Sequence, residues 1–191
     1  IMTLLAVAIV LLAGLLFFEK KENRKGLLPT KTLLSLLFLI TGISQIHFIQ
    51  PYTLFIMMGL LFCLGGDVFL ALPQDRMFLF GLVSFLLGHV CYVIGFVWIA
   101  SLGKLTLTGA MVTMVLSGFV FAWLRPHLGA MKKPVIAYIL VISLMFIGAW
   151  SVLGMTHQPL MARLFVFTGA ACFYISDIFV ARDRFLKNEF I

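Results

Sequence analysis

Charged residues are scarce in this chain. Only 11% of its 191 residues are Asp, Glu, Lys or Arg, and no stretch is polar enough to form a separate soluble domain. Soluble domains carry about a quarter charged residues, so the scarcity excludes an ordinary water-soluble protein. Hydrophobic residues make up 63% of the sequence and the mean hydropathy is +1.16, values typical of an integral membrane protein.

Cysteines and recognisable catalytic motifs are also few. Cys63, Cys91 and Cys172 all fall inside apolar runs. We interpret them as small core residues and not as a disulfide framework. The sequence contains no Gly-x-Ser-x-Gly, P-loop, dinucleotide-binding or His-Glu-x-x-His motif. We therefore predict neither a cofactor nor a bound metal.

What the sequence does contain is a series of apolar runs, each long enough to cross a bilayer. A spanning helix needs about 20 mostly apolar residues, and irregular backbone in lipid would lack hydrogen-bond partners. The predicted fold class is all-α, a polytopic transmembrane helix bundle that forms a single domain over residues 1–191. Its seven predicted spans are 1–18, 30–47, 52–72, 77–100, 105–124, 134–153 and 160–181. The prolines fall at or near the boundaries of these spans, at Pro29, Pro51, Pro73, Pro126, Pro134 and Pro159.

The basic residues predict how the spans are oriented. With seven alternating spans, all of the 14 Lys and Arg residues except Lys104 and Arg163 fall on one side. By the positive-inside rule that side is cytoplasmic, which places the N-terminus outside and the tail after residue 181 inside. The net charge of +7 then reflects topology and contact with lipid headgroups, and no nucleic-acid partner is predicted. The short loops favour a bacterial inner membrane, and the oligomeric state stays open.

A short internal repeat links two distant spans. The segment Asp67–Ala71 (DVFLA) recurs as Asp177–Ala181 (DIFVA), and an Asp-Arg pair follows each copy. Copies four spans apart run in the same direction, as in a duplicated four-span unit with parallel 4+4 topology. The alternative is a chance match in a very apolar chain. If the duplication is real, the partner of the fourth span should follow residue 184, so we expect an eighth span beyond the residues given.

The same two segments contain the only acidic residues inside any predicted span, Asp67 and Asp177. Each precedes its cytoplasmic boundary by roughly 6–8 Å at the helical rise. A charged group in hydrocarbon is costly, and such residues usually face the bundle interior and mark function. The structural alternative is a polar pair, or an aspartate that reaches the basic interface. We take both aspartates as the candidate catalytic residues.

Other polar residues are candidates for supporting roles. His89 is the only histidine well inside a span, beside Tyr92 on the same side of its helix. It is either a hydrogen-bonded core residue or a member of the site, and a zinc site would need His89 to converge with both aspartates. Lys31, at the cytoplasmic start of its span, is placed either to meet a lipid phosphate or to anchor the helix. The span of His89 also carries a stripe of small residues suited to close helix packing, at Gly81, Ser84, Gly88, Cys91 and Gly95.

In order and spacing, several short motifs resemble the YhhN family of membrane proteins, whose animal members are the lysoplasmalogenases. The motifs are Pro29–Lys31, Gly65–Ala71, Phe80–Phe85, Gly88-His89, Tyr92 and Gly169–Asp177. The resemblance implies eight spans, and it implies hydrolysis of the vinyl ether bond of a lysoplasmalogen to a fatty aldehyde and a glycerophospho-base. The family's two acids correspond to Asp67 and Asp177.

Further residues of the matching motifs are predicted to support the site, namely His89, Tyr92, Ser176 and Gly66. Gly66 would let a substrate or a neighbouring helix approach closely. The implied partners are a lysophospholipid substrate and membrane lipids. Two carboxyl groups suit this chemistry, because a vinyl ether yields once its β-carbon is protonated. The rival classes are a proton- or ion-coupled carrier that uses the same buried acids and a structural subunit without a site.

Overall fold

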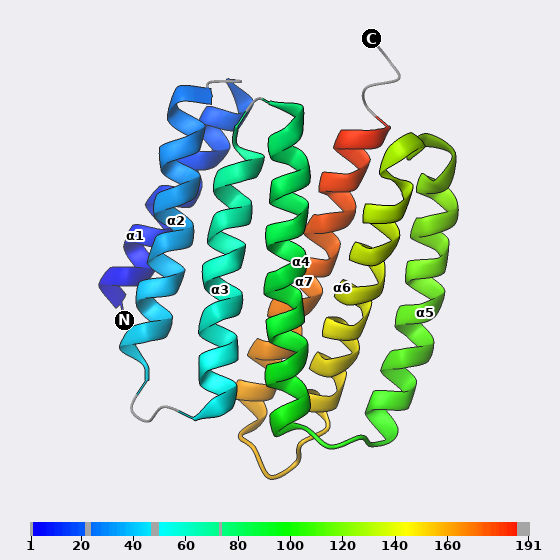
Figure 1. Cartoon of the computed structure of the whole chain (residues 1–191). Coiled ribbons are helices and arrows are strands. Elements are labelled where there is room, and N and C mark those ends of the chain that lie inside the picture. The colour runs from blue at the N-terminus through cyan, green and yellow to red at the C-terminus, as the bar shows by residue number, and fades with distance from the viewer. Residues whose placement is uncertain (1, 22–23, 47–49, 73, 187–191) are drawn as a thin grey trace. The chain divides into compact units, whose positions relative to one another are not determined.

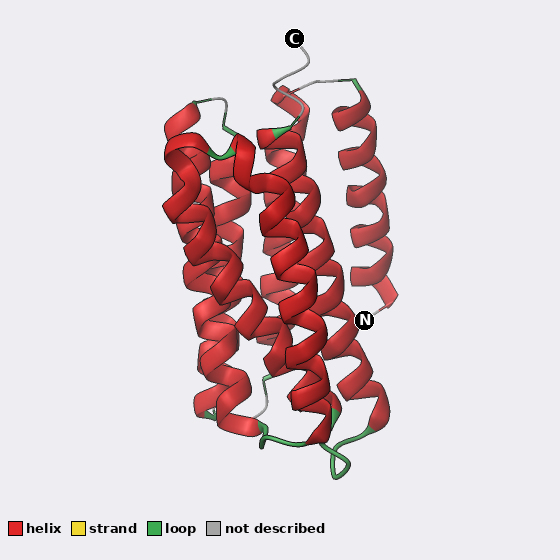
Figure 2. Cartoon of the chain, turned by 90° about the vertical axis from the view of Figure 1, so that its right-hand side faces the viewer, coloured by secondary structure: helices red, strands yellow, loops and turns green. Residues whose placement is uncertain are grey.

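The structure is a computed structural model that describes residues 2–21, 24–46, 50–72 and 74–186. These residues form seven α-helices and two 3₁₀ turns, without a strand among them (Figure 1). Figure 2 shows the helices joined by short loops. The elements are α1 (Met2–Lys20), α2 (Arg24–Ser44), α3 (Pro51–Leu70), α4 (Asp75–Ile99), α5 (Lys104–Leu124), η1 (Arg125–His127), η2 (Gly129–Met131), α6 (Lys132–Leu153) and α7 (Leu160–Phe185). The all-α prediction and the seven expected helices are confirmed.

Five stretches are by themselves long and apolar enough to cross a membrane. They are Pro51–Leu70, Arg76–Ile99, Lys104–His127, Gly129–Leu153 and Leu160–Phe185. Two further apolar helical segments are shorter, Ala6–Phe18 and Leu28–Ser44. The chain is therefore an integral membrane protein. The outside location of the N-terminus and the parallel repeat stay predictions.

The prolines mark most helix starts, with one exception. Pro51 opens α3, Pro134 lies in the first turn of α6, and Pro159 caps the start of α7. Pro73 is outside the described residues. Pro29 was expected at the boundary of a span beginning at residue 30, but it lies inside α2, which starts at Arg24.

Pro29 is the sixth residue of α2, just past the first turn, so its missing N–H costs the helix a single i→i−4 hydrogen bond. Neighbouring hydroxyls also supply donors to the backbone there. Thr30 donates to the carbonyl of Gly26 at 2.7 Å, and Thr32 donates to that of Leu28 at 2.8 Å.

The chain forms two compact units, Ile1–Cys91 and Tyr92–Ile191, whose division falls within α4. We refer to them as unit 1 and unit 2. In unit 1, α2 packs against both α1 and α3, and in unit 2, α6 packs against both α5 and α7 (Figure 1). The expectation of a single domain over residues 1–191 stays a prediction.

In unit 1 the small residues of α4 pack closely against α3. A Cβ atom on Gly88 would lie 2.9 Å from Sγ of Cys63 and 3.0 Å from the carbonyl oxygen of Gly59. Ser84 donates a hydrogen bond to the carbonyl of Phe62 at 2.6 Å. Close approach of backbones at small residues is how membrane helices gain van der Waals contact without a hydrophobic driving force. The predicted role of the small-residue stripe is confirmed here.

The cysteine prediction is correct for two residues and wrong for the third. Cys63 and Cys91 are buried, whereas Cys172 on α7 is exposed. All faces of α7 carry apolar residues, so hydropathy does not distinguish the face that packs on α6 from the others. Phe165 and Phe179 on the same helix are exposed as well.

We expect Gly88→Ala to destabilise the protein by about 1–3 kcal/mol, because the added methyl would press on the α3 backbone at Gly59. The matched control is Gly118→Ala on α5, where no heavy atom among the described residues lies within 4 Å of the added Cβ. There the gain in helix propensity should leave stability unchanged or raise it by up to about 1 kcal/mol. Thermal unfolding of the purified variants in detergent would measure both changes. Equal stabilities for the two variants would contradict the packing argument.

Candidate active site

Both carboxylate oxygens of Asp67 are in contact with donors from α2. Asp67 lies in the last turn of α3, and α2 carries Lys31 and Ser35 four residues apart, on one face. The Lys31 ammonium nitrogen is 3.2 Å from Oδ1 of Asp67, and the Ser35 hydroxyl donates to Oδ2 at 2.5 Å. The side chains of Lys31 and Asp67 are 28% and 23% exposed. We call these three residues the Asp67 cluster.

The Asp67 cluster balances a negative charge inside a span. A single charge at this depth is expensive, and pairing it with an ammonium and a hydroxyl compensates the cost. Sequence reasoning expected Lys31 either to meet a lipid phosphate or to anchor the helix, and the structure places it against Asp67. The headgroup contact stays a prediction. Sequence reasoning missed Ser35, although its spacing from Lys31 was the signal that could have found it.

Phe85 and His89 on α4 are buried, and Phe85 packs against Gly66 of α3, next to Asp67 in the sequence. The ring of Phe85 lies so close to Gly66 that a Cβ there would be 2.5 Å from it. The close approach expected at Gly66 is therefore made by a helix side chain. His89 is completely buried, and its Nδ1 lies 2.6 Å from the carbonyl oxygen of Phe85. A carbonyl only accepts, so Nδ1 carries the proton in this contact. This arrangement is that of a hydrogen-bonded core histidine, and a supporting role in the site stays a prediction.

In unit 2, Asp177 is held from α6. It lies about two turns before the end of α7, and the hydroxyl of Tyr138, near the start of α6, donates to its Oδ2. Tyr138 is buried at 8% exposure, and Asp177 is half-buried. Of the other predicted supporting residues in this unit, Tyr92 is half-buried and Ser176 is exposed. We call Asp177 and Tyr138 the Asp177 cluster.

One turn from Asp177, a chain of hydroxyl groups ties the three helices of unit 2 together. The Ser117 hydroxyl on α5 is 2.6 Å from the Tyr174 hydroxyl on α7 and 2.6 Å from the Ser143 hydroxyl on α6. Ser143 in turn donates to the carbonyl of Ile139. This fixes one direction of donation, from Tyr174 to Ser117 to Ser143 to the carbonyl. Each hydroxyl along this path has an acceptor, so the chain fixes the face that α7 presents to its neighbours.

On the C-terminal side of Asp177, residues of α7 pack against an apolar cluster. Leu124, Leu128 and Val135 are almost fully buried in it. Partly buried residues packed against these three include Ile139, next to Tyr138, and Ala181, one turn after Asp177. The Asp177 cluster thus lies between hydroxyl groups and an apolar layer.

The two units share a local arrangement. In unit 1 the aspartate lies on α3 and accepts from side chains of α2, and in unit 2 it lies on α7 and accepts from a side chain of α6. The donors differ, since Lys31 and Ser35 serve Asp67 while Tyr138 serves Asp177. The common arrangement supports the duplication inferred from the sequence, which stays a prediction.

The fold and the two clusters define a polytopic membrane protein with two hydrogen-bonded intramembrane carboxyl groups. The model of the YhhN family matches residues 27–190, and the chain belongs to this family. It is 32% identical over 167 residues to the lysoplasmalogenase of Mycobacterium bovis, an alignment that covers 81% of this chain and 59% of that protein. It is 31% identical over 140 residues to the lysoplasmalogenase TMEM86A of Bos taurus, covering 71% and 56%. No solved structure is significantly similar to the chain.

The chain therefore spans less than two thirds of the length of these relatives. The family resemblance drawn from the motifs is confirmed.

We expect Ser117→Ala to destabilise the protein by roughly 0.5–2 kcal/mol, because it leaves the hydroxyls of Tyr174 and Ser143 without this partner. Reversible unfolding in mixed detergent micelles would measure the change. Thr168→Ala is the matched control, since its exposed hydroxyl donates, among the described residues, to Leu164 and Phe165 within α7. An equal effect of the two substitutions would show that the hydroxyl chain adds nothing to stability.

Proposed function

We propose that this chain is a membrane-embedded hydrolase that cleaves the vinyl ether bond of lysoplasmalogens, with Asp67 and Asp177 as its acid and base. Three findings support the proposal. The chain belongs to the YhhN family, and the relatives reported above are named lysoplasmalogenases. Each of the two aspartates is also held in a defined orientation by a donor on the neighbouring helix. This last observation carries the proposal, because acid–base catalysis needs fixed carboxyl groups.

The reaction needs one carboxyl group as proton donor and one as carboxylate. The acid protonates the β-carbon of the vinyl ether, and the π electrons of the double bond form the new C–H bond. The ether oxygen stabilises the resulting oxocarbenium ion, assisted by the negative carboxylate. Water then attacks this carbon and gives up a proton to the carboxylate, which yields a hemiacetal.

Collapse of the hemiacetal restores both groups. The protonated base returns its proton to the departing glycerol oxygen as the C–O bond breaks. The first carboxylate takes the proton of the hemiacetal hydroxyl as the aldehyde forms. The net reaction adds one water and releases a fatty aldehyde and a glycerophospho-base, so no oxidant or cofactor enters the balance.

The position of the two clusters fits an amphipathic lipid. Asp67 and Asp177 lie in the final turns of helices that end on the predicted cytoplasmic side. A lysolipid bound among the helices would place its vinyl ether, next to the headgroup, at this depth. Basic residues at the same helix ends would meet the phosphate, and Lys31 is the candidate closest to Asp67. We propose a bacterial inner membrane location with a cytoplasmic C-terminal tail.

The experiment that tests this function is aldehyde release from a lysoplasmenyl lipid by the purified protein. We expect Asp67→Asn and Asp177→Asn each to lower kcat/KM roughly 10²- to 10⁴-fold. The kcat/KM of the double variant should be only slightly below that of the less active single variant, because the effects of residues that act in one reaction are strongly non-additive. Asp183→Asn, an exposed position near the end of α7, is the control and should retain turnover.

Each alternative outcome has a defined meaning. Full turnover in a folded Asp67→Asn or Asp177→Asn variant contradicts the two-carboxyl mechanism. Absence of aldehyde with the unsubstituted protein, together with aspartate-dependent flux of a lipid or ion in liposomes, would support the carrier class instead. Absence of both activities would support a structural subunit.

A further inference from the structure

In unit 1, the ammonium group of Lys31 is within reach of two kinds of anion. α2 begins at Arg24, so Lys31 lies about two turns into the helix. A lysine near the end of a membrane span commonly extends its four-carbon stem toward the phosphates at the membrane surface. Here the ammonium nitrogen is instead 3.2 Å from Oδ1 of Asp67. Asp67 therefore occupies a cation that a lipid phosphate at this end of α2 would also attract.

The contact with Asp67 leaves the ammonium with further donors. An ammonium group has three N–H donors, and the contact with Oδ1 uses one of them. The side chains of Lys31 and Asp67 are 28% and 23% exposed, so packing does not seal the pair. The phosphodiester of a lysophospholipid has two charged oxygens that accept such donors in strong, charge-assisted hydrogen bonds.

Ser35 supplies Asp67 with a donor that does not depend on Lys31. It lies one turn further along the same face of α2, and its hydroxyl donates to Oδ2 of Asp67 at 2.5 Å. Because this bond is made by the other carboxylate oxygen, it persists when the ammonium moves away from Oδ1. Asp67 then keeps one hydrogen bond inside the span, and Oδ1 becomes accessible to the substrate.

We infer that Lys31 is a shared cation, which pairs with Asp67 in the resting protein and with the phosphate of the bound lysolipid. This inference rests on the proposed function, which supplies the lysolipid. Binding of the phosphate draws the ammonium from Oδ1, so the substrate itself uncovers Asp67. The substrate class is therefore a phosphate-bearing lysolipid and not an alkenylglycerol. Lys31 binds the substrate, and Ser35 is a positioning residue.

Binding of a lipid that cannot be cleaved tests the shared cation without turnover. A 1-alkyl lysophospholipid has a saturated ether in place of the vinyl ether, and a 1-alkylglycerol has the same tail without phosphate. We expect Asp67→Asn to bind the alkyl lysophospholipid roughly 5-fold more tightly or better, because competition between two anions for one cation is reciprocal. Lys31→Met should weaken this binding roughly 10-fold. Neither substitution should alter the affinity for the alkylglycerol.

The double variant distinguishes a shared cation from simple repulsion between anions. Loss of the Asp67 charge would favour any nearby anion even without Lys31. Lys31→Met/Asp67→Asn should therefore bind the alkyl lysophospholipid no more tightly than Lys31→Met, and it leaves neither partner as an unpaired charge that would impair folding. Tightening of the same size in the Lys31→Met background, or none in Asp67→Asn, would overturn the inference.

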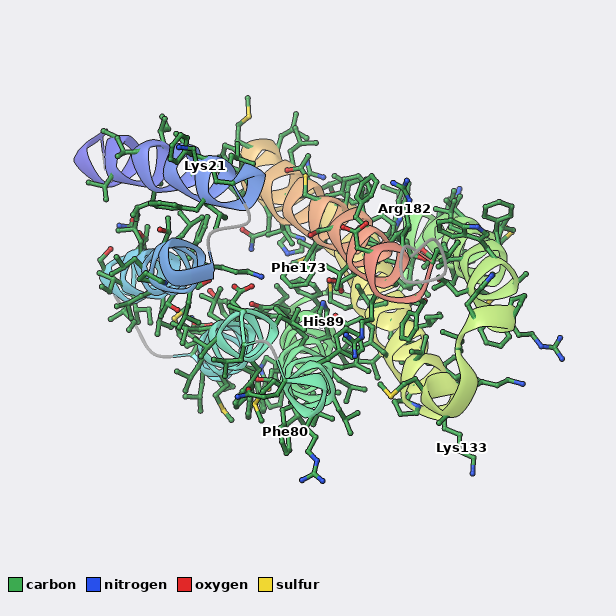
Figure 3. The ribbon with its side chains drawn as sticks, turned by 90° about the horizontal axis from the view of Figure 1, so that it is seen from above. Lys21, Phe80, His89, Lys133, Phe173 and Arg182 are labelled. Atoms are coloured by element: carbon green, nitrogen blue, oxygen red, sulfur yellow. The ribbon has the colours of Figure 1, made fainter. Side chains whose placement is uncertain are left out.

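Two controls address the loss of positive charge and the source of the phosphate. Lys133, at the start of α6, is an exposed lysine (Figure 3), and Lys133→Met should bind the alkyl lysophospholipid as the unsubstituted protein does. A loss equal to that in Lys31→Met would overturn the role of Lys31. Inorganic phosphate should bind Asp67→Asn and the unsubstituted protein equally weakly. The same tightening with inorganic phosphate would overturn the lipid as the source of the anion.

Infrared difference spectroscopy reports the contact at Oδ1 directly. Addition of the alkyl lysophospholipid should shift the carboxylate stretching band, because Oδ1 loses its ammonium partner. The shift should be absent in Asp67→Asn, in Lys31→Met and with the alkylglycerol, and its absence from the unsubstituted protein would overturn the inference. The expected binding pattern without aldehyde release from a lysoplasmenyl lipid would overturn the hydrolase and leave the shared cation standing. Aldehyde release without that pattern would overturn the shared cation alone.

Discussion

A carboxyl group inside a bilayer has no water to satisfy it, so its donors must come from another helix. This constraint accounts for the local structure around both aspartates. Asp67 near the end of α3 requires α2 beside it, and Asp177 on α7 requires α6. The middle helix of each unit is accordingly the one that packs on both neighbours. Helix packing and carboxyl chemistry therefore depend on the same contacts.

The small residues of α4 contribute to this arrangement in unit 1. Gly88 lets the backbone of α3 approach closely, and Gly66 on α3 makes room for the Phe85 ring of α4. A methyl group at Gly88 would press on the backbone of α3 at Gly59. In unit 2 the hydroxyl chain through Ser117 has the corresponding effect, because it joins α5, α6 and α7 one turn from Asp177.

The helices could be predicted from hydropathy alone, because a helix that crosses a lipid bilayer is a long apolar run in the sequence. Most boundaries agree with the expected spans to within about two residues. The exceptions are α2, whose helix continues through Pro29 back to Arg24, and α7, which ends at Phe185 and not at residue 181. The two aspartates were also predictable, because an acid within an apolar run is costly wherever it lies. Their partners were not. Which side chain of α2 or α6 meets an aspartate depends on the rotation of each helix about its axis, and nearly uniform hydrophobicity does not encode that rotation.

Tyr138 and Cys172 are two residues whose surroundings hydropathy did not predict. Tyr138 looked like one aromatic among many, and only its position on the buried face of α6 reveals its hydroxyl as a donor to Asp177. Cys172 looked like a core residue and is exposed, because every face of α7 is apolar. In an amphipathic helix of a soluble protein, the position of the polar face would have shown which of these two side chains is buried.

The repeated sequence motif conceals a chemical difference. The five-residue segments that begin at Asp67 and Asp177 share three residues and are conservative at the other two. The middle helices nevertheless present an ammonium with a serine hydroxyl to one aspartate and a phenol to the other. A symmetric pair of carboxyl groups would be a poor acid–base pair, because catalysis requires one to be protonated while the other is ionised. The two repeated segments therefore place their aspartates beside chemically different donors, a difference that lies in α2 and α6 and not in the repeated segments themselves.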